Sequence, residues 1–311
     1  MASAPTYPSR RRFLQTLAAL GAAGILPAGL TAPASFPVLT RPIPSNGERI
    51  PAIGMGTWQT FDVGGDRYRV ADRAQVLRTF LQLGGGLVDS SPMYGSSEQV
   101  LGECLAQLED SDGLFAATKV WTPGQWLGKR QMEKSRQLWG LPRFDLMQIH
   151  NMLDWESHLE TLKAWKAEGR IRYIGITTSH GRRHDDLAAA LTAEPFDFVQ
   201  FTYNVLDREA EQRLLPLAAE RGIAVIINRP FRRGDLFGHV RGHALPDWAA
   251  EFDCSNWAQF FLKFIVSHPA VSCAIPATSR VDHMRENMGA LHGRLPDAAM
   301  RQRMIRHMEA L

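Results

Sequence analysis

Short apolar runs recur along the chain and alternate with segments that have a helical hydrophobic period. Several of the runs are almost continuously apolar, which is typical of parallel strands that are covered on both faces. We therefore predict eight strands, at residues 52–57, 86–90, 114–120, 144–150, 171–177, 196–203, 222–228 and 271–277. The segments between them predict helices; Val70, Ala74 and Leu77, for example, share one helical face. Ser96 with Gln99 fits a capping box at the start of the second helix.

Eight strand-then-helix units in one chain favour a (β/α)8 TIM barrel, a fold of the α/β class. The Asn46-Gly47 pair lies between short apolar positions and predicts an N-terminal β-hairpin before the barrel. The rival is a doubly wound sheet, which would place a glycine-rich turn directly after its first strand. Gly54-Met55-Gly56 lacks the third glycine of that fingerprint, so the barrel is the better interpretation. We assign it to residues 35–311 as one domain.

Residues 1–34 have the composition of a targeting segment. Arg10, Arg11 and Arg12 precede a short apolar stretch, and Ala32-Pro33-Ala34 ends the segment as a cleavage site would. The Ser-Arg-Arg-Arg-Phe-Leu run resembles a twin-arginine signal peptide. That resemblance implies that the Tat export machinery is a partner, and that the folded protein reaches the periplasm or the outside of the cell.

The composition argues against several other classes of protein. Outside residues 1–34 the acidic and basic side chains are equal in number, so charge gives no reason to expect nucleic acid or an anionic membrane as partner. No apolar run is long enough for a stable membrane anchor. The three cysteines have no paired spacing that would indicate a disulfide framework or a zinc site.

Polar and titratable residues occur where the predicted strands end. Asp89 ends the second strand, Lys119 lies in the third, His150 ends the fourth and Gln200 lies in the sixth. Tyr94 follows Asp89 by five residues. Because the carboxyl ends of barrel strands meet at one face, these groups are expected to converge in one pocket.

The order and spacing of these residues resemble the aldo-keto reductase family. The resemblance is carried by Asp89-x4-Tyr94-Gly-Ser-Ser-Glu, Thr118-Lys119, the strand end at His150, Gly54-x-Gly56-Thr57-Trp58 and Glu286-Asn287. It implies reduction of aldehydes or ketones by NAD(P)H, with Tyr94, Lys119, Asp89 and His150 as the catalytic tetrad. A cation about 4 Å from a phenol contributes roughly 4 kcal/mol at an effective dielectric of 20, so Lys119 is expected to bring the Tyr94 pKa towards neutrality.

The same resemblance implies the cofactor site. By position, the candidate ligands are Gly56, Thr57, Trp58, Thr177, Thr178, Gln200, Asn228, Arg229, Thr278, Arg280, Glu286 and Asn287. Asn228 replaces the family's stacking ring, and Phe231 is the candidate substitute. The arginines at 229, 232 and 233 suit a diphosphate, although the last two also fit a solvated basic loop. NADP is weakly favoured over NAD. Trp58 and Trp121 would line the substrate mouth, with no metal required.

Other interpretations remain open from the sequence. Taken singly, Asp89 and Lys119 also fit a structural ion pair, and His150 and Tyr94 fit buried or loop-capping roles. A non-catalytic nucleotide-binding barrel, acting as a redox sensor or partner-binding protein, is the alternative function. A metal-dependent barrel hydrolase would recruit His150, His180 and His184.

Overall fold

The computed structural model describes residues 37–108 and 113–311. Within them, eight strands form one sheet in chain order, and every neighbouring pair is parallel. The strands are β3 (Met55–Gly56), β4 (Leu87–Asp89), β5 (Phe115–Val120), β6 (Phe144–Ile149), β7 (Ile171–Thr177), β8 (Phe198–Thr202), β9 (Ala224–Asn228) and β10 (Cys273–Ala274). Parallel bridges join Ile53 to Ala274 and Gly56 to Ala277, so the first strand meets the last and the sheet closes. The predicted (β/α)8 barrel is confirmed.

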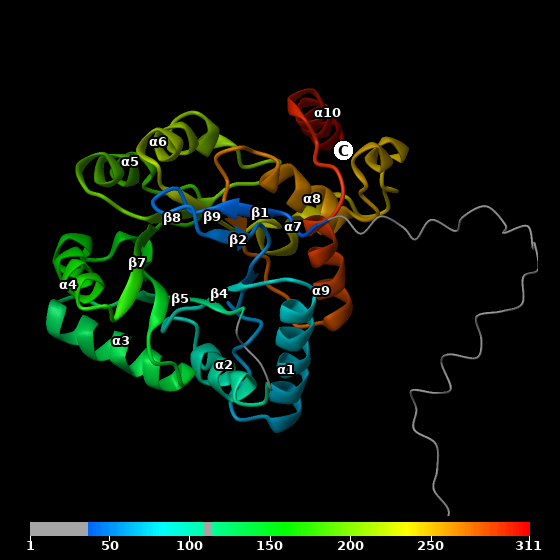
Figure 1. Ribbon diagram of the computed structural model, residues 1–311. Helices are drawn as coiled ribbons and strands as arrows, with labels where there is room; N and C mark the ends of the chain where they lie inside the picture. Colours follow the sequence, from blue (N-terminus) through cyan, green and yellow to red (C-terminus); the bar gives the residue numbers. More distant parts are fainter. Residues whose placement is uncertain (1–36, 109–112) are drawn as a thin grey trace, which may run out of the picture. The chain divides into compact units, whose positions relative to one another are not determined.

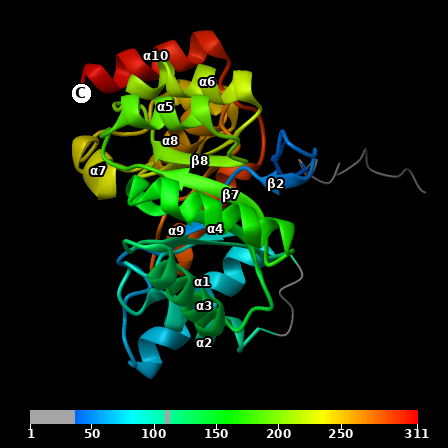
Figure 2. The same cartoon turned by 90° about the vertical axis from the view of Figure 1, so that its left-hand side faces the viewer.

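A helix follows each strand of the barrel, and these helices lie on the outside of the sheet (Figures 1 and 2). They are α1 (Arg67–Gln82), α2 (Ser97–Leu105), α3 (Gln125–Trp139), α4 (Trp155–Ala167), α5 (His184–Ala193), α6 (Leu214–Arg221), α8 (Trp257–Val266) and α9 (Val281–Met288). A short α7 (Asp235–His239) lies between β9 and α8, and α10 (Ala298–Glu309) follows the barrel. Short 3-10 helices occupy His150–Met152, Glu209–Glu211, Arg232–Gly234, Asp247–Phe252 and Gly289–Leu291.

Two local predictions differ from the structure. The first and last strands are shorter than predicted, and Pro276 supplies a reason at β10, because it has no N–H to continue the ladder. The capping box is wrong: Ser96 precedes α2, but its hydroxyl makes no capping bond. Instead, Ser96 Oγ donates to Asp62 Oδ1 (2.8 Å) and accepts from Gly64 N (2.8 Å), which ties the loop before α1 to the start of α2.

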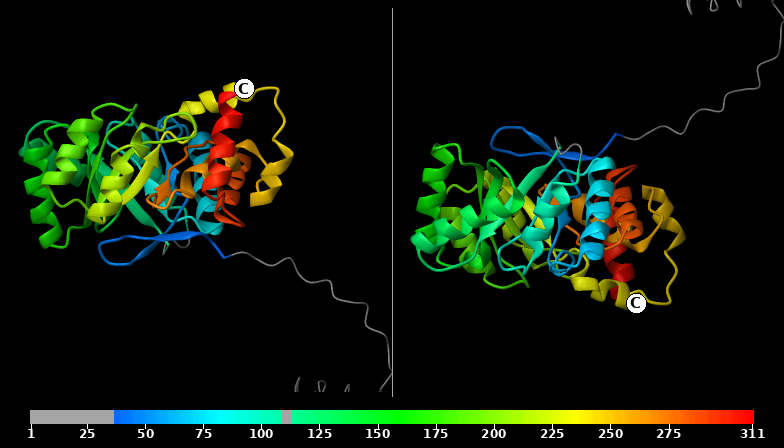
Figure 3. Two further views of the ribbon diagram at one scale, coloured as in Figure 1. Left: turned by 90° about the horizontal axis from the view of Figure 1, so that it is seen from above. Right: turned by 90° about the horizontal axis from the view of Figure 1, so that it is seen from below.

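The predicted hairpin is confirmed and covers one end of the barrel. It pairs β1 (Thr40–Pro42) with β2 (Arg49–Pro51) in antiparallel register, and Gly47 in its turn has a φ of 79°. In both views of Figure 3 the hairpin, in blue, lies across one end of the strands. Ile43 and Ile50 belong to the apolar cluster inside the barrel. The hairpin therefore closes the end opposite the carboxyl ends of the strands.

The barrel interior changes from apolar to polar along the strands. Near the hairpin it is filled by buried apolar side chains that include Leu87, Leu146, Phe198 and Ile226. Strand side chains repeat on one face every second residue, so the next inward positions lie one layer nearer the carboxyl ends. Those positions hold Asp89, Gln148, Gln200 and Asn228. A layer of polar side chains thus lies between the apolar interior of the barrel and the carboxyl ends of the strands.

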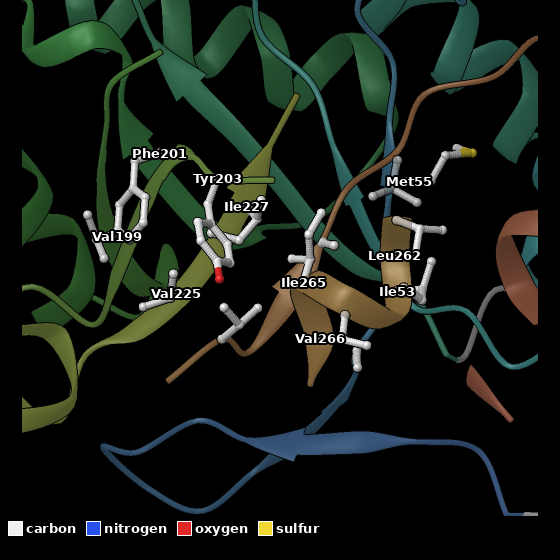
Figure 4. Close-up of a cluster of buried hydrophobic side chains, with 14 of the residues drawn as sticks. Ile53, Met55, Val199, Phe201, Tyr203, Val225, Ile227, Leu262, Ile265 and Val266 are labelled. Atoms are coloured by element: carbon white, nitrogen blue, oxygen red, sulfur yellow. The ribbon is translucent and has the colours of Figure 1, made fainter. Parts of the chain in front are cut away.

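The outward faces of the same strands anchor this layer. Figure 4 shows aliphatic and aromatic side chains of β8, β9 and α8 that belong to one buried apolar cluster. The buried residues involved are Val199, Phe201, Val225, Ile227, Leu262, Ile265 and Val266. Because alternate residues point to opposite faces, each apolar outward side chain fixes the register of the polar inward neighbours.

The predicted twin-arginine segment, residues 1–34, lies outside the described residues. Across the part of the chain that the structure describes, we find no helix with the length and apolar character needed to cross a membrane.

Candidate active site

A buried ion pair forms the base of the candidate site. Lys119 on β5 is fully buried, and its Nζ donates to Asp89 Oδ2 at the end of β4 (2.5 Å). It also donates to the carbonyl oxygen of Ser90 (2.8 Å). Burial lowers the pKa of Lys119, but Asp89 and Tyr94 together outweigh it, so the net shift is upwards. Lys119 therefore stays charged inside the barrel.

Asp89 connects this ion pair to the polar layer. Its Oδ1 accepts from Gln148 Nε2 (2.8 Å) and from Gln200 Nε2 (3.1 Å). Gln148 fits because Gly175 faces it: a Cβ at that glycine would lie 2.8 Å from Gln148 Cγ. Both oxygens of Asp89 are thus occupied, which holds the carboxylate, and through it Lys119, in one position.

Tyr94 lies in the loop between β4 and α2, directly above Lys119. The ammonium is 5.1 Å from the centre of the Tyr94 ring. The tyrosine ring is partly exposed, while its hydroxyl is surrounded by protein, and this burial raises the pKa of Tyr94. Lys119 and Arg229 lower that pKa, but burial and the nearby Asp89 carboxylate together outweigh them. The expectation of a Tyr94 pKa near neutrality is therefore wrong for this state, because removal of the phenolate from water, with Asp89 close by, costs more than the two cations recover.

His150 lies beside Tyr94, immediately after β6. The two ring centres are 5.7 Å apart, with the planes nearly perpendicular. The imidazole is 6 % exposed, and its Nδ1 lies 2.9 Å from the hydroxyl oxygen of buried Ser91. Burial, helped by Lys119, lowers the pKa of His150 to about 2. His150 is consequently neutral at physiological pH and can orient an oxygen by hydrogen bonding.

These groups open into a cavity of about 330 Å³ at the carboxyl ends of the strands. Of the residues predicted from the sequence, its lining includes Asp89, Tyr94, His150, Gly56, Thr57, Trp58, Thr177, Thr178, Gln200, Asn228 and Arg229. Lys119 lies beneath the cavity rather than on its wall. A phenol, a neutral imidazole, a buried ammonium and a carboxylate therefore meet at one pocket, as the strand ends predict.

A comparison with known protein families shows the family to which the chain belongs. The model of the Aldo/keto reductase family matches residues 52–304, which span the whole barrel. The chain belongs to this family. The match includes the ion pair, Tyr94, His150 and the cavity between them.

Individual aldo-keto reductases are distant from this chain in sequence. Methylglyoxal reductase YeaE of Escherichia coli is 25% identical over 256 residues, covering 81% of this chain and 89% of that protein. An NADH-specific methylglyoxal reductase of the same organism is 26% identical over 307 residues, covering 79% and 91%. The holo form of an aldo-keto reductase from Bacillus halodurans superposes with a TM-score of 0.72 at 21% identity, covering 87% of this chain and 96% of that one. The superposition shows the shared fold.

Besides Lys119, five of the residues predicted to be in the site are not among those that line the cavity. They are Trp121, Thr278, Arg280, Glu286 and Asn287. Trp121 lies at the rim, where it is 41% exposed and its ring centre is 6.5 Å from that of His150. The other four belong to the segment from β10 into α9. Arg280 there is ion-paired with Asp282, two residues along the chain.

Asn228 and Phe231 lie where the family resemblance places the ring that stacks on the nicotinamide. Both side chains contact other parts of the protein. Asn228 Nδ2 donates to the carbonyl of Thr178 (2.9 Å) and to Gln200 Oε1 (3.3 Å). Phe231 lines the cavity, but its ring packs against Phe237 (4.9 Å between centres) and Phe261 (6.2 Å). Both side chains are therefore fixed by the protein before any ligand enters.

Two contributors were not identified from the sequence: Ser91 is the hydrogen-bond partner of His150, and Gln148 holds Asp89. His180 and Arg233, which the sequence suggested for a metal site and for a diphosphate, line the cavity mouth. The alternation of inward positions on β6 could have identified Gln148. A contact between distant loops decides the role of Ser91, and no pattern within one segment reports it.

The metal-hydrolase interpretation finds no ligand set in the described residues. Among them, no group of three or more histidine, cysteine, aspartate or glutamate side chains is arranged to hold a metal ion. His150 is instead bonded to Ser91, and His180 to Ser179 and Arg233.

Proposed function

We propose that this protein is an NAD(P)H-dependent reductase of small aldehydes or ketones, with Tyr94 as the proton donor. The observation that carries the proposal is the meeting of Tyr94, His150 and the Lys119–Asp89 pair at one cavity. Two relatives named as methylglyoxal reductases support a small carbonyl substrate. The alternative is a nucleotide-binding barrel without activity. It is supported by Asn228, whose side chain already donates hydrogen bonds to Thr178 and Gln200.

The cavity fits a nicotinamide. Thr178 Oγ1 is buried on the cavity wall and has no hydrogen-bond partner in the described residues, so it is available to a carboxamide. When bound, the reduced nicotinamide supplies the hydride. Thr177, Thr178, Asn228 and the Gly56–Trp58 segment would hold that end, and Thr278, Arg280, Glu286 and Asn287 the adenosine end. We propose NADP as the cofactor, with NAD as the alternative, and solved relatives include complexes with NADP and NADPH.

The chain's own residues supply the proton. Tyr94 is protonated at neutral pH, because the ordinary pKa of a phenol is about 10 and burial raises it further, so its hydroxyl can donate to the oxygen of the carbonyl group. Lys119 stabilises the phenolate that this transfer leaves, and Asp89 keeps Lys119 in place. Neutral His150 orients the same oxygen from the side.

Purified protein tests this assignment. We expect NADPH oxidation with a panel of small aldehydes, and a loss of about a thousandfold in kcat for Tyr94→Phe. Equilibrium titration of NADPH fluorescence should give the same affinity for both proteins within about twofold, because the hydroxyl is not assigned to cofactor binding. Tight nucleotide binding without turnover would favour the non-catalytic alternative. Failure to bind NADPH and NADH would contradict both.

We also propose that the protein is exported by the twin-arginine machinery to the periplasm or the outside of the cell. The arginine pair followed by an apolar stretch within residues 1–34 supports this. Expression of the full chain in a bacterium, followed by cell fractionation, tests it. We expect the wild type outside the cytoplasm and the Arg10→Lys/Arg11→Lys chain inside. Identical distributions would contradict export by this route.

A further inference from the structure

Two arginines and a tryptophan form one wall of the cavity mouth. Arg233 and Arg229 come from the loop after β9, and Trp58 comes from the loop after β3. The guanidinium carbons of Arg233 and Arg229 lie 4.2 Å and 5.9 Å from the centre of the Trp58 ring. Both guanidinium groups thus lie near the Trp58 ring. The ring stabilises each cation, but the two positive charges still repel each other.

Neither cation is ion-paired in the described residues. Arg232, between them in sequence, is paired with Asp207 (3.1 Å), which is the acid whose charge also acts on Arg229. Arg233 lies 3.3 Å from the ring nitrogen Nε2 of His180, and burial with the nearby arginines lowers the pKa of that imidazole. Within residues 37–108 and 113–311, half-buried Arg229 has neither an ion pair nor a side-chain hydrogen bond. Burial and Arg233 lower its pKa to about 10. An anion at this wall would satisfy groups that the protein leaves without a counter-charge.

The loop is strained in order to hold this arrangement. Arg229, Arg232 and Arg233 have φ values of 51°, 48° and 62°, in the left-handed region that side chains other than glycine and asparagine rarely adopt. Such strain persists only where the surrounding structure maintains it, and it is often found at ligand sites.

The position of Arg229 indicates which anion binds. Arg229 and Tyr94 line the same cavity, and the charge of Arg229 acts to lower the pKa of the Tyr94 hydroxyl. The sequence suggests a diphosphate ligand for Arg229, but a ribose separates the diphosphate of a dinucleotide from its nicotinamide. Because Arg229 faces the same cavity as the Tyr94 hydroxyl, it is better placed to bind a substituent of the substrate than to bind the diphosphate.

We propose that Arg229, assisted by Arg233 over the Trp58 ring, binds the carboxylate of substrates that carry both an acid group and a reducible carbonyl. This inference rests on the proposed reductase function and adds the substrate class. The carboxylate lies against the guanidinium groups while the carbonyl oxygen lies between Tyr94 and His150.

Matched substrates test the proposal. We compare kcat/KM for 4-carboxybenzaldehyde with that for its uncharged methyl ester, methyl 4-formylbenzoate. We expect the wild type to prefer the acid, and Arg229→Gln to lose roughly tenfold to a hundredfold on the acid and less than about threefold on the ester. Arg229→Lys, which keeps the charge but loses the planar fork, should lie between them. Arg232→Gln removes the same charge from the same loop but not from the cavity wall, so it should retain the preference.

Binding provides a readout that does not depend on turnover. Calorimetry with NADP-loaded protein should detect benzoate but not benzamide, and Arg229→Gln should abolish the difference. NADPH affinity should stay within about twofold in that variant. A loss of NADPH affinity together with equal losses on both aldehydes would overturn the proposal in favour of the diphosphate. The proposal would also be overturned if the wild type showed no preference for the acid over the ester. The same holds if Arg232→Gln lost as much kcat/KM on the acid as Arg229→Gln.

The two proposals can fail separately. If the wild type reduces neither aldehyde but binds benzoate through Arg229, the reductase function is wrong and the carboxylate site stands. If it reduces the ester as well as the acid and does not bind benzoate, the function stands and the carboxylate site is wrong. Arg233→Gln serves as a second variant if Arg229→Gln unfolds at a lower temperature than the wild type; it should weaken benzoate binding.

Discussion

The hydroxyl of Ser91 lies 2.9 Å from Nδ1 of His150, and both side chains are buried. Ser91 Oγ already accepts a hydrogen bond from Met93 N (3.2 Å), so its own proton is available for the imidazole. A neutral imidazole that accepts at Nδ1 carries its proton on Nε2. We therefore expect Ser91 to donate to Nδ1 and His150 to donate a hydrogen bond from Nε2.

Removal of that hydroxyl should weaken catalysis without weakening cofactor binding. We expect Ser91→Ala to lower kcat roughly tenfold, the equivalent of about one net hydrogen bond, and Ser91→Thr to restore most of it. The imidazole nitrogen shifts of His150 in NMR spectra report the tautomer directly. An unchanged tautomer in Ser91→Ala would show that Ser91 does not position His150.

Carbonyl reduction should depend little on pH between 5 and 9. The folded pKa of His150 is about 2, so the imidazole does not gain a proton as the pH falls from 7 to 5. The pKa of Tyr94 is raised, so the proton donor is not lost as the pH rises from 7 to 9. Initial rates at saturating NADPH check this. A fall in kcat with a midpoint near pH 6.5 would indicate that His150 titrates normally.

The Lys119–Asp89 pair should contribute to stability as well as to chemistry. Lys119→Met leaves a buried carboxylate unpaired, which typically costs about 3–5 kcal/mol in the free energy of unfolding. The double variant Lys119→Met/Asp89→Leu should recover much of that loss, because no charge then remains in the barrel. Urea denaturation measures both.

An exposed lysine provides the control for this experiment. Lys163 pairs with Glu160 (3.3 Å) and Glu194 (3.0 Å) at the surface of α4. Lys163→Met should change the unfolding free energy by less than about 1 kcal/mol. Equal losses of unfolding free energy in Lys119→Met and Lys163→Met would show that breaking the buried pair costs no more than breaking an exposed one.

Gly102 should tolerate no side chain, because α2 and α3 approach closely at this residue. A Cβ there would lie 1.8 Å from the backbone carbonyl oxygen of Leu138, which cannot rotate away. We expect Gly102→Ala to lower the unfolding free energy by about 2 kcal/mol or more through overpacking. Gly238 in α7 has no atom within 4 Å of the equivalent position, so Gly238→Ala should be neutral or slightly stabilising. Thermal unfolding of the two variants tests the contrast.

The fold could be predicted from the sequence because its signals are local. Apolar runs such as 171–177 and 144–150 match β7 and β6 within one residue, and the Asn46-Gly47 turn matches the hairpin. Where a local rule failed, a contact from elsewhere had displaced it. Ser96 bonds to Asp62 and Gly64, which its own segment does not contain.

By itself, the sequence determined the barrel, and it indicated that Asp89, Tyr94, Lys119 and His150 lie at one end of it. The strand period and the rule that strand ends converge are enough for that. Only the tertiary structure decided the state of those groups. Burial raises the Tyr94 pKa against the effect of Lys119, the Ser91 hydroxyl lies against Nδ1 of His150, and Arg229 makes no ion pair among the residues that the structure describes. Each depends on desolvation and on atoms from distant loops, which spacing along one chain does not report.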